Sequence, residues 1–304
     1  MKYYQNILKV IGRTPLVRLN LNGRNEARIL AKLEFLNPSG SIKDRMALYM
    51  VEKAERRGVL KRGATIIEAT TGNTGIALAM VAVIKGYQML AVMPENMSQE
   101  RQQLMAAFGA KFILTPKDEG PQGAINRRNE LAKETRNSWV PGQFENTDNI
   151  SAHQKTTGRE IIEQAGGKVD AFVTGVGTGG TLMGVARALK RINPKVKIIA
   201  VEPKESAVIS GKRPGSHHIQ GIGEGFIPKI VDLKMIDWAE KVSSLEAERM
   251  AKRLAREEGI LAGISSGANV VAAMRVAEKL GKGKTIVTVL PDRGERYFSM
   301  GVLG

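Results

Sequence analysis

The sequence predicts an α/β protein made of two three-layer domains with mainly parallel sheets. Short apolar runs alternate with helical patterns along all 304 residues, which is typical of parallel strands covered by helices on both faces. The stretch 138–152 has weak periodicity and many turn residues, so we expect the chain to cross between the two domains there. Two sheets would then face each other across a cleft, where ligands normally bind.

Hydrophobic periodicity places the individual elements. Short apolar runs bounded by turn residues predict buried strands at 65–68, 89–93, 111–114, 171–174, 196–201 and 285–290. Helical spacing of apolar residues predicts helices at 72–86, 98–109, 121–136, 153–166, 179–192, 244–258 and 266–280. Near the N-terminus, an apolar run at 29–35 leads into a helical pattern at 46–54.

The composition argues against several classes of function. Cysteine is absent, and the histidines (His153, His217, His218) lack metal-ligand spacing, so neither a cysteine nucleophile nor a metal is expected. The net charge of +16 comes from basic residues scattered among acidic ones, and with only 5% aromatic residues we expect no nucleic-acid partner. The longest apolar run has nine residues, where a membrane span needs about 20. Since no secretory signal is found either, we expect a cytoplasmic protein with no membrane partner.

Lys43 stands at the start of a predicted helix, in the run Asn-Pro-Ser-Gly-Ser-Ile-Lys-Asp-Arg at 37–45. The start of a helix carries about half a positive elementary charge, which lowers the pKa of an amine placed there. Such an amine can act as a neutral nucleophile or stand beside a bound anion. Taken alone, Lys43 is more simply a solvated lysine in a first turn, and its interpretation depends on the motifs that follow.

Two glycine-rich loops share one design, in which a buried strand ends, the chain turns and a helix begins. The first reads Thr-Thr-Gly-Asn-Thr-Gly at 70–75, and the second reads Gly-Val-Gly-Thr-Gly-Gly-Thr at 175–181. Glycine lets the backbone approach a ligand closely, and the free amides at a helix start point at an anion. Two such loops in different domains suggest two anions, one on a cofactor and one on a substrate.

The second loop also fits a dinucleotide. Gly175, Gly177 and Gly180 match the G-x-G-x-x-G pattern, and Glu202 ends the next strand, although a plain tight turn fits this loop as well. A nicotinamide cofactor does not account for Lys43, for the hydroxyl-rich first loop, or for Gly-Ile-Ser-Ser-Gly at 263–267 before a helix. Pyridoxal 5′-phosphate (PLP) accounts for all four. It needs a lysine, a phosphate loop and a partner for its pyridine nitrogen, and its amino-acid substrate needs a second anion site for the carboxylate.

Four motifs together resemble the cysteine synthase (O-acetylserine sulfhydrylase) family, whose members are fold type II, or tryptophan synthase β-like, PLP enzymes. They are the segments 37–45, 70–75, 177–181 and 263–267, and the resemblance extends from 11–19 to 292–299. It implies PLP in the cleft between two domains and a homodimer. The smaller, mobile domain would comprise 45–147 and carry the substrate-carboxylate loop. The larger would comprise 1–44 and 148–304 and carry the phosphate loop.

The resemblance implies roles for individual residues. Lys43 would be the catalytic residue, forming the Schiff base with PLP and then taking the substrate's α-proton. The implied cofactor-binding residues are Lys43, Asn73 at the phenolic oxygen, Gly177, Thr178, Gly179, Gly180 and Thr181 at the phosphate, and Ser265 at the pyridine nitrogen. The implied substrate-binding residues are Thr70, Thr71, Asn73, Thr74 and Gln143. Singly, Asn73 also fits a turn residue and Ser265 a helix cap, and we expect His153 to pack or cap rather than catalyse.

The implied reaction is β-replacement, in which O-acetyl-L-serine loses acetate to give an aminoacrylate that sulfide converts to L-cysteine. The first half of the chain and Asp-Arg-Gly-Glu-Arg at 292–296 resemble the B-type isozyme, whereas 211–226 and the loop at 177–181 resemble the A-type. B-type enzymes accept bulkier donors such as thiosulfate, so the donor stays open, as does O-phosphoserine as the first substrate. Thr71 replaces the family's usual serine, and Arg213 is a candidate contact for an anionic donor or a phosphorylated serine.

Other activities remain open at this point. Cystathionine β-synthase shares the four motifs and would condense serine with homocysteine. A serine or threonine dehydratase fits less well, because elimination alone needs no pocket for a second nucleophile. A catalytically silent scaffold that binds a partner's C-terminal carboxylate would not need Lys43.

Overall fold

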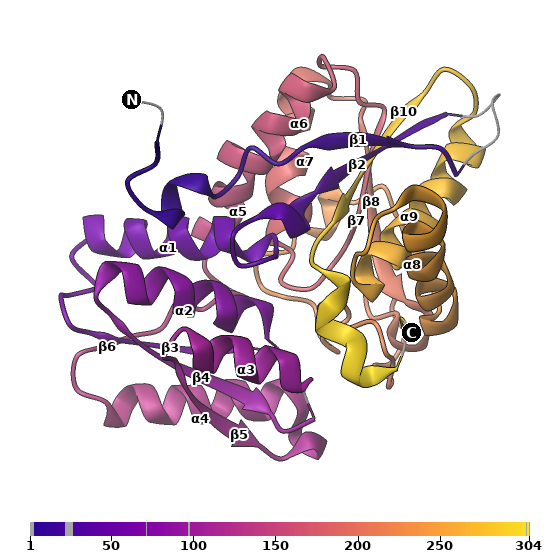
Figure 1. The fold of residues 1–304 in the computed structure, drawn as a ribbon. Helices are drawn as coiled ribbons and strands as arrows, with labels where there is room; N and C mark the ends of the chain where they lie inside the picture. Colours follow the sequence, from indigo (N-terminus) through magenta and orange to yellow (C-terminus); the bar gives the residue numbers. More distant parts are fainter. Residues whose placement is uncertain (1–2, 22–26, 71, 97, 302, 304) are drawn as a thin grey trace.

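The computed structural model describes residues 3–21, 27–70, 72–96, 98–301 and 303, and within them the chain forms two sheets flanked by helices (Figure 1). The larger sheet has the strand order β1-β2-β10-β7-β8-β9. Its strands are β1 (Leu16–Leu19), β2 (Arg28–Leu33), β7 (Ala171–Gly175), β8 (Lys197–Pro203), β9 (Trp238–Val242) and β10 (Thr285–Leu290). The smaller sheet has the order β5-β4-β3-β6. Its strands are β3 (Thr65–Ala69), β4 (Gln88–Pro94), β5 (Lys111–Thr115) and β6 (Ser138–Trp139).

The predicted α/β class with mainly parallel sheets is confirmed, with one exception to the strict alternation of strand and helix. β1 and β2 pair antiparallel, with Leu16 opposite Lys32 and Leu19 opposite Ile29. Parallel neighbours need a crossover of a dozen or more residues, and 20–27 is too short for one. Three strands were not predicted, namely β1, β6 and β9. β1 has only four residues and includes the exposed Arg18. β6 is only two residues long, and β9 is an edge strand whose Glu240 and Lys241 interrupt the apolar run.

The helices lie close to their predicted positions. They are α1 (Lys43–Arg56), α2 (Asn73–Lys85), α3 (Gln99–Ala107), α4 (Gly120–Glu134), α5 (Asp148–His153), α6 (Arg159–Gln164), α7 (Gly180–Ile192), α8 (Ser244–Glu258) and α9 (Ile264–Leu280). Short 3-10 segments occupy Ile7–Val10, Glu34–Leu36, Lys117–Glu119, Lys204–Ser206, Leu233–Met235 and Gly294–Met300. The single helix predicted at 153–166 is instead α5 and α6 joined by a π-helical turn at Gln154–Gly158.

Each sheet is covered by helices on both faces, because successive side chains of a strand point to opposite sides. In β7, Phe172 packs in the core formed with α7, whereas its neighbour Val173 packs in the core formed with α8 and α9. In β3, Ile66 packs against α1 and α2, whereas Ile67 packs against α4. This double burial explains why these strands read as continuous apolar runs.

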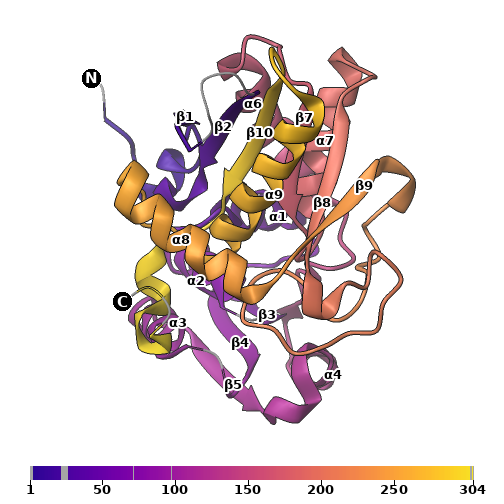
Figure 2. The same ribbon diagram turned by 90° about the vertical axis from the view of Figure 1, so that its right-hand side faces the viewer.

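The two sheets lie beside each other, and the smaller one is the lower in both views (Figures 1 and 2). All strands of the smaller sheet fall between Thr65 and Trp139, and Leu8 from the N-terminal segment packs into the same core. The loop at 70–75 follows β3, and the segment 176–179 follows β7. The glycine-rich loops therefore extend from the carboxyl ends of parallel strands, where ligands bind in α/β proteins. Among the described helices, none is both long and apolar enough to cross a membrane.

Candidate functional site

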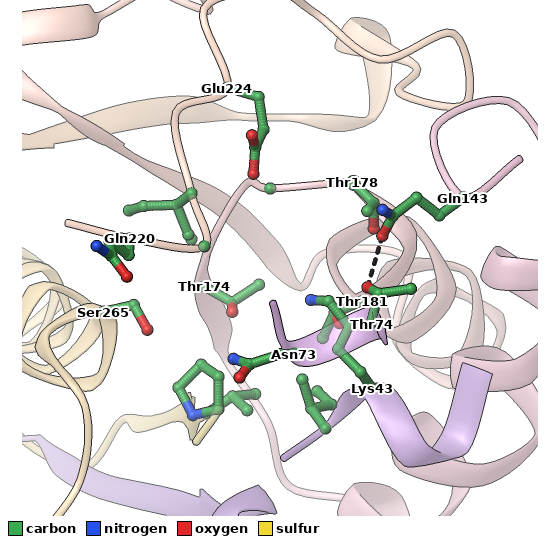
Figure 3. A pocket seen from close by; sticks show the side chains of 18 of the residues that line it. Lys43, Asn73, Thr74, Gln143, Thr174, Thr178, Thr181, Gln220, Glu224 and Ser265 are labelled. Carbon is green, nitrogen blue, oxygen red and sulfur yellow. Dashed lines mark hydrogen bonds between the residues drawn. The ribbon is translucent and has the colours of Figure 1, made fainter. Parts of the chain in front are cut away.

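A pocket between the two sheets collects most of the predicted site residues (Figure 3). The predicted residues in its lining are Lys43, Asn73, Thr74, Gln143, Gly177, Thr178, Gly179, Thr181 and Ser265. Gly180 is the first residue of α7 and stands in the sequence between two lining residues, Gly179 and Thr181. Thr70 lies behind the first loop, and Thr71 is outside the described residues. No group of three or more histidine, aspartate and glutamate side chains in the described part of the chain could hold a metal ion.

Lys43 is the first residue of α1, and its amine points into the pocket (Figure 3). Burial lowers the pKa of this amine, and the charge of Arg101 lowers it further, whereas the Glu224 and Asp292 carboxylates raise it. Burial is therefore the largest influence on the pKa of Lys43, whereas the sequence had suggested the positive end of the helix as the cause. A lysine with a lowered pKa can lose its proton near neutral pH, as a nucleophile or a base must.

The second glycine-rich loop is shaped by close approaches that only glycine allows. A Cβ atom on Gly177 would lie 2.3 Å from the backbone oxygen of Gly221, and one on Gly180 would lie 2.0 Å from Oδ1 of Asn149. Gly179 has φ = +85°, in the left-handed region. The loop leads into α7, whose first turn leaves backbone N–H groups without partners inside the helix. This arrangement suits a phosphate group.

Gly177→Ala is expected to weaken cofactor binding. The added methyl group collides with backbone rather than with a movable side chain, so the loop must shift. We expect the cofactor's dissociation constant to rise about tenfold or more, measured by equilibrium dialysis of the purified variant. Thermal unfolding of the cofactor-free protein separates this effect from a loss of folding. An unchanged dissociation constant would contradict the assignment of the loop to the phosphate.

The first loop is held from behind by hydrogen bonds. The Thr70 hydroxyl oxygen accepts hydrogen bonds from the backbone N–H groups of Gly72 (3.0 Å) and Gly75 (3.2 Å). The Thr74 hydroxyl donates to Oε1 of Gln143 at 2.6 Å (Figure 3). The Gln143 amide in turn donates to the backbone oxygen of Ala69 at 2.7 Å. Thr74 and Gln143 thus stand together at the start of α2, whereas Thr70 shapes the loop, and its contact with a substrate stays a prediction.

Asn73 is fixed by two partners at the edge of the pocket. Its amide nitrogen donates to Oδ2 of Asp292 at 2.6 Å, and its amide oxygen accepts a hydrogen bond from Arg296. An amide group carries two N–H donors, so one remains for a ligand. The phenolic Tyr297 also donates to Oδ2 of Asp292, at 2.7 Å. Asn73 is therefore a held donor rather than only a turn residue.

Ser265 and His153 take different positions. Ser265 is the second residue of α9, and its hydroxyl lies in the pocket lining (Figure 3). His153 is buried behind the second loop, with Nδ1 3.0 Å from the Thr157 hydroxyl and Nε2 3.4 Å from the Thr181 hydroxyl. Burial, with added repulsion from Arg45 and Lys43, holds the pKa of His153 well below its usual range. A neutral histidine that orients Thr181 agrees with the expected packing role.

Four charged residues in or beside the pocket were not predicted from the sequence as site residues. Arg101 and Glu224 line the pocket directly, and Asp292 and Arg296 lie beside it, each hydrogen-bonded to Asn73. Arg101 also donates to the Tyr297 hydroxyl at 2.9 Å and contacts Gln220. Glu224 offered only an isolated charge between glycines, and Arg101 only a charged residue in a helix, and both are common on protein surfaces. Arg213, a candidate contact for an anion, is exposed and is not part of the pocket lining.

These residues fit PLP. The phosphate would bind at the start of α7, where Gly177 leaves a space that a side chain would fill. The remaining N–H of Asn73 can reach a phenolic oxygen, and the Ser265 hydroxyl can donate to a pyridine nitrogen. Lys43 offers its amine across the pocket from Ser265 (Figure 3). The donors and the amine match the three polar groups and the aldehyde of the cofactor.

Comparisons with known proteins agree with this chemistry. Residues 7–292 match the family of pyridoxal-phosphate dependent enzymes. A cysteine synthase of Staphylococcus aureus is 52% identical over 300 residues, which cover 98% of this chain and 96% of the relative. A cysteine synthase structure from Entamoeba histolytica has a TM-score of 0.94 and 46% identity, covering 99% of this chain and 91% of that one. An O-acetylserine dependent cystathionine β-synthase from Helicobacter pylori has a TM-score of 0.94 and 42% identity, covering 99% of both chains.

Proposed function

Because this chain belongs to the family of pyridoxal-phosphate dependent enzymes, as a relative of the cysteine synthases, we propose that it makes L-cysteine from O-acetyl-L-serine and sulfide. One observation carries the proposal. The amine of Lys43, the phosphate loop and the Thr74–Gln143 pair converge on one pocket from both sheets. A reaction on an amino acid needs these three functions, namely a base, an anchored cofactor and a site for the substrate carboxylate.

Lys43 acts first as the attachment point of the cofactor and then as the base. When bound, PLP supplies an electron sink that stabilises negative charge at the substrate's α-carbon. Burial keeps the pKa of the Lys43 amine low, so the amine can accept the α-proton when acetate leaves from the β-carbon. The amine can return that proton to the α-carbon when sulfide adds.

The other residues orient the reactants. Backbone N–H groups at 70–75, together with the remaining N–H of Gln143, hold the substrate carboxylate close to Lys43, and the Thr74 hydroxyl keeps Gln143 in position. The loop at 177–181 holds the cofactor phosphate, and Asn73 donates to the phenolic oxygen. Ser265 would donate a hydrogen bond to the pyridine nitrogen and, unlike an aspartate, would not hold a proton there. A serine at this position would therefore favour loss of a β leaving group over transamination.

The smaller domain, residues 45–147, closes over the bound substrate in this proposal. Support comes from Arg101 on α3, which reaches across to Tyr297 and Gln220 outside that segment. Closure would bring the loop at 70–75 toward Lys43 and exclude water. The chain would act as a cytoplasmic homodimer, as its resemblance to the family implies.

A substrate panel tests the proposed function. O-acetylserine, O-phosphoserine and serine are added separately to the PLP-loaded protein, each with sulfide, thiosulfate or homocysteine as the second substrate. We expect O-acetylserine with sulfide to give the highest kcat/KM for amino-acid product, measured by chromatography. The release of acetate without a second substrate reports the first half of the reaction alone. No product from either O-acetylserine or O-phosphoserine would overturn the proposal, and a preference for serine with homocysteine would assign the cystathionine reaction instead.

A further inference from the structure

Glu224 is an acidic residue of the pocket for which the reaction above has no role. It lies in the segment Gly-Ile-Gly-Glu-Gly at 221–225, and its carboxylate points down into the pocket, across from Lys43 (Figure 3). Within the described part of the chain, no hydrogen bond or ion pair engages this carboxylate. Glu224 is only partly exposed, and a carboxylate without a hydrogen-bond partner in the pocket that holds the Lys43 amine points to a function.

Glu224 also stands where the pocket meets the solvent. It lines a second, wider cavity, which we name the outer groove and which is formed mainly by residues 117–122, 214–217 and 220–226. The aromatic rings of Phe144 and Phe226 pack edge to face beside it, with centroids 5.3 Å apart. Phe144 lines the pocket and Phe226 the outer groove. The two cavities share the lining residues Gln220, Gly221, Ile222 and Glu224, so a nucleophile that enters through the outer groove passes close to Glu224 before it reaches the substrate.

A negative charge at Glu224 acts differently on anionic and on neutral nucleophiles. An anion such as thiosulfate meets repulsion from this carboxylate in an enclosed site, where charges interact more strongly than in water. A neutral hydrogen sulfide or thiol meets no such penalty, but it must lose its proton to react well. Burial raises the pKa of Glu224, while Lys43 and Arg101 lower it. The raised pKa brings the carboxylate closer to the range of a useful proton acceptor.

We propose that Glu224 accepts the proton of a neutral sulfur nucleophile as that nucleophile attacks the substrate's β-carbon, an inference that rests on the proposed function. The S–H bond breaks and its proton passes to a carboxylate oxygen of Glu224. The electron pair of the sulfur forms the bond to the β-carbon, from which acetate has already departed. The α-carbon recovers its proton from Lys43, and Glu224 releases its own proton to solvent through the outer groove.

Glu224→Gln tests this inference in the PLP-loaded enzyme. It keeps the shape of the side chain and removes its charge and basicity. We expect acetate release from O-acetylserine to stay within about twofold, while cysteine formation falls about 10²-fold below the pKa of hydrogen sulfide. Above that pKa the deficit should shrink, because hydrosulfide has already lost its proton. Other charged groups facing Glu224 from the pocket or the outer groove stay in place: Lys43, Arg101, Lys117, Asp118, Glu119 and His217.

A second readout does not depend on turnover. Binding of thiosulfate to the PLP-loaded protein without a first substrate is measured by calorimetry, and we expect Glu224→Gln to bind it about tenfold more tightly. Glu119→Gln removes a charge of the same kind from the outer groove and should change neither result. Glu224→Asp keeps a carboxylate, so it should regain part of the rate of cysteine formation at low pH. Such a recovery would show that the loss in Glu224→Gln does not come from misfolding.

The outcomes separate the two proposals. If the wild-type protein releases no acetate from O-acetylserine, the proposed function fails before Glu224 is involved. If it releases acetate but Glu224→Gln makes cysteine at the wild-type rate at every pH, the role of Glu224 is wrong. A variant that loses acetate release as strongly as cysteine formation would also overturn it, because the carboxylate would then serve the first half of the reaction.

Discussion

Lys43→Ala is expected to lower kcat for cysteine formation by at least about 10³-fold. The variant loses both the covalent attachment of the cofactor and the base for the α-proton, and no second lysine lines the pocket within the described residues. The visible absorbance of the PLP-loaded wild-type protein should be lost or shifted in the variant. Steady-state kinetics with O-acetylserine and sulfide and an absorption spectrum of the dialysed protein check the two effects.

Lys53→Ala is a matched control on the same helix. Its ammonium group lies 5.6 Å from the centre of the Tyr49 ring and does not line the pocket. We expect wild-type absorbance and a kcat close to the wild-type value. If Lys43→Ala kept both the absorbance and the activity, the assignment of the catalytic lysine would be wrong, whatever the behaviour of the control.

The sequence could predict those parts of the site that are formed by one short, continuous segment of the chain. A buried strand, a glycine-rich turn and a helix start follow one another at 65–76 and at 171–182, so the local pattern already indicated an anion site. Lys43 was identifiable for the same reason, because the turn before it and the helix after it are contiguous. The alternation of these units also predicted the parallel sheets.

The remaining parts depend on contacts between distant segments. Arg101 and Tyr297 meet although 196 residues separate them, and Asn73 meets Asp292 across 219 residues. Neither hydrophobic periodicity nor spacing along the chain carries information about such pairs. Glu224 was missed for a related reason. A lone acidic residue between glycines resembles a surface turn until the outer groove and the pocket are seen to meet at it.

Arg45→Met is expected to lower the free energy of unfolding by about 3–5 kcal/mol. Arg45 is buried just after Lys43, and its guanidinium group binds Glu34 at 2.6 Å and Glu160 at 2.6 Å. Lys32 also binds Glu160, at 2.7 Å. Methionine fills a similar volume but leaves Glu34 enclosed without its cation. Urea unfolding measures the loss, and Arg159→Met, which breaks an exposed pair with Glu163, should change stability little.

The pH dependence of the free energy of unfolding in the acid range distinguishes a lost ion pair from lost packing. Burial opposes the charge of Glu160, but the hydrogen bonds and charge of Arg45 outweigh it and lower the pKa of this carboxyl from about 4.5 to about 2. A lowered carboxyl pKa contributes stability above the unfolded-state value, and this contribution disappears as the pH falls through the folded-state value. The deficit of Arg45→Met relative to the wild type should therefore shrink between about pH 4.5 and about pH 2. Asp44, whose pKa burial raises to about 6, contributes with the opposite sign but is present in both proteins. A deficit that stays constant across this window would mean that Arg45 stabilises the start of α1 through packing alone.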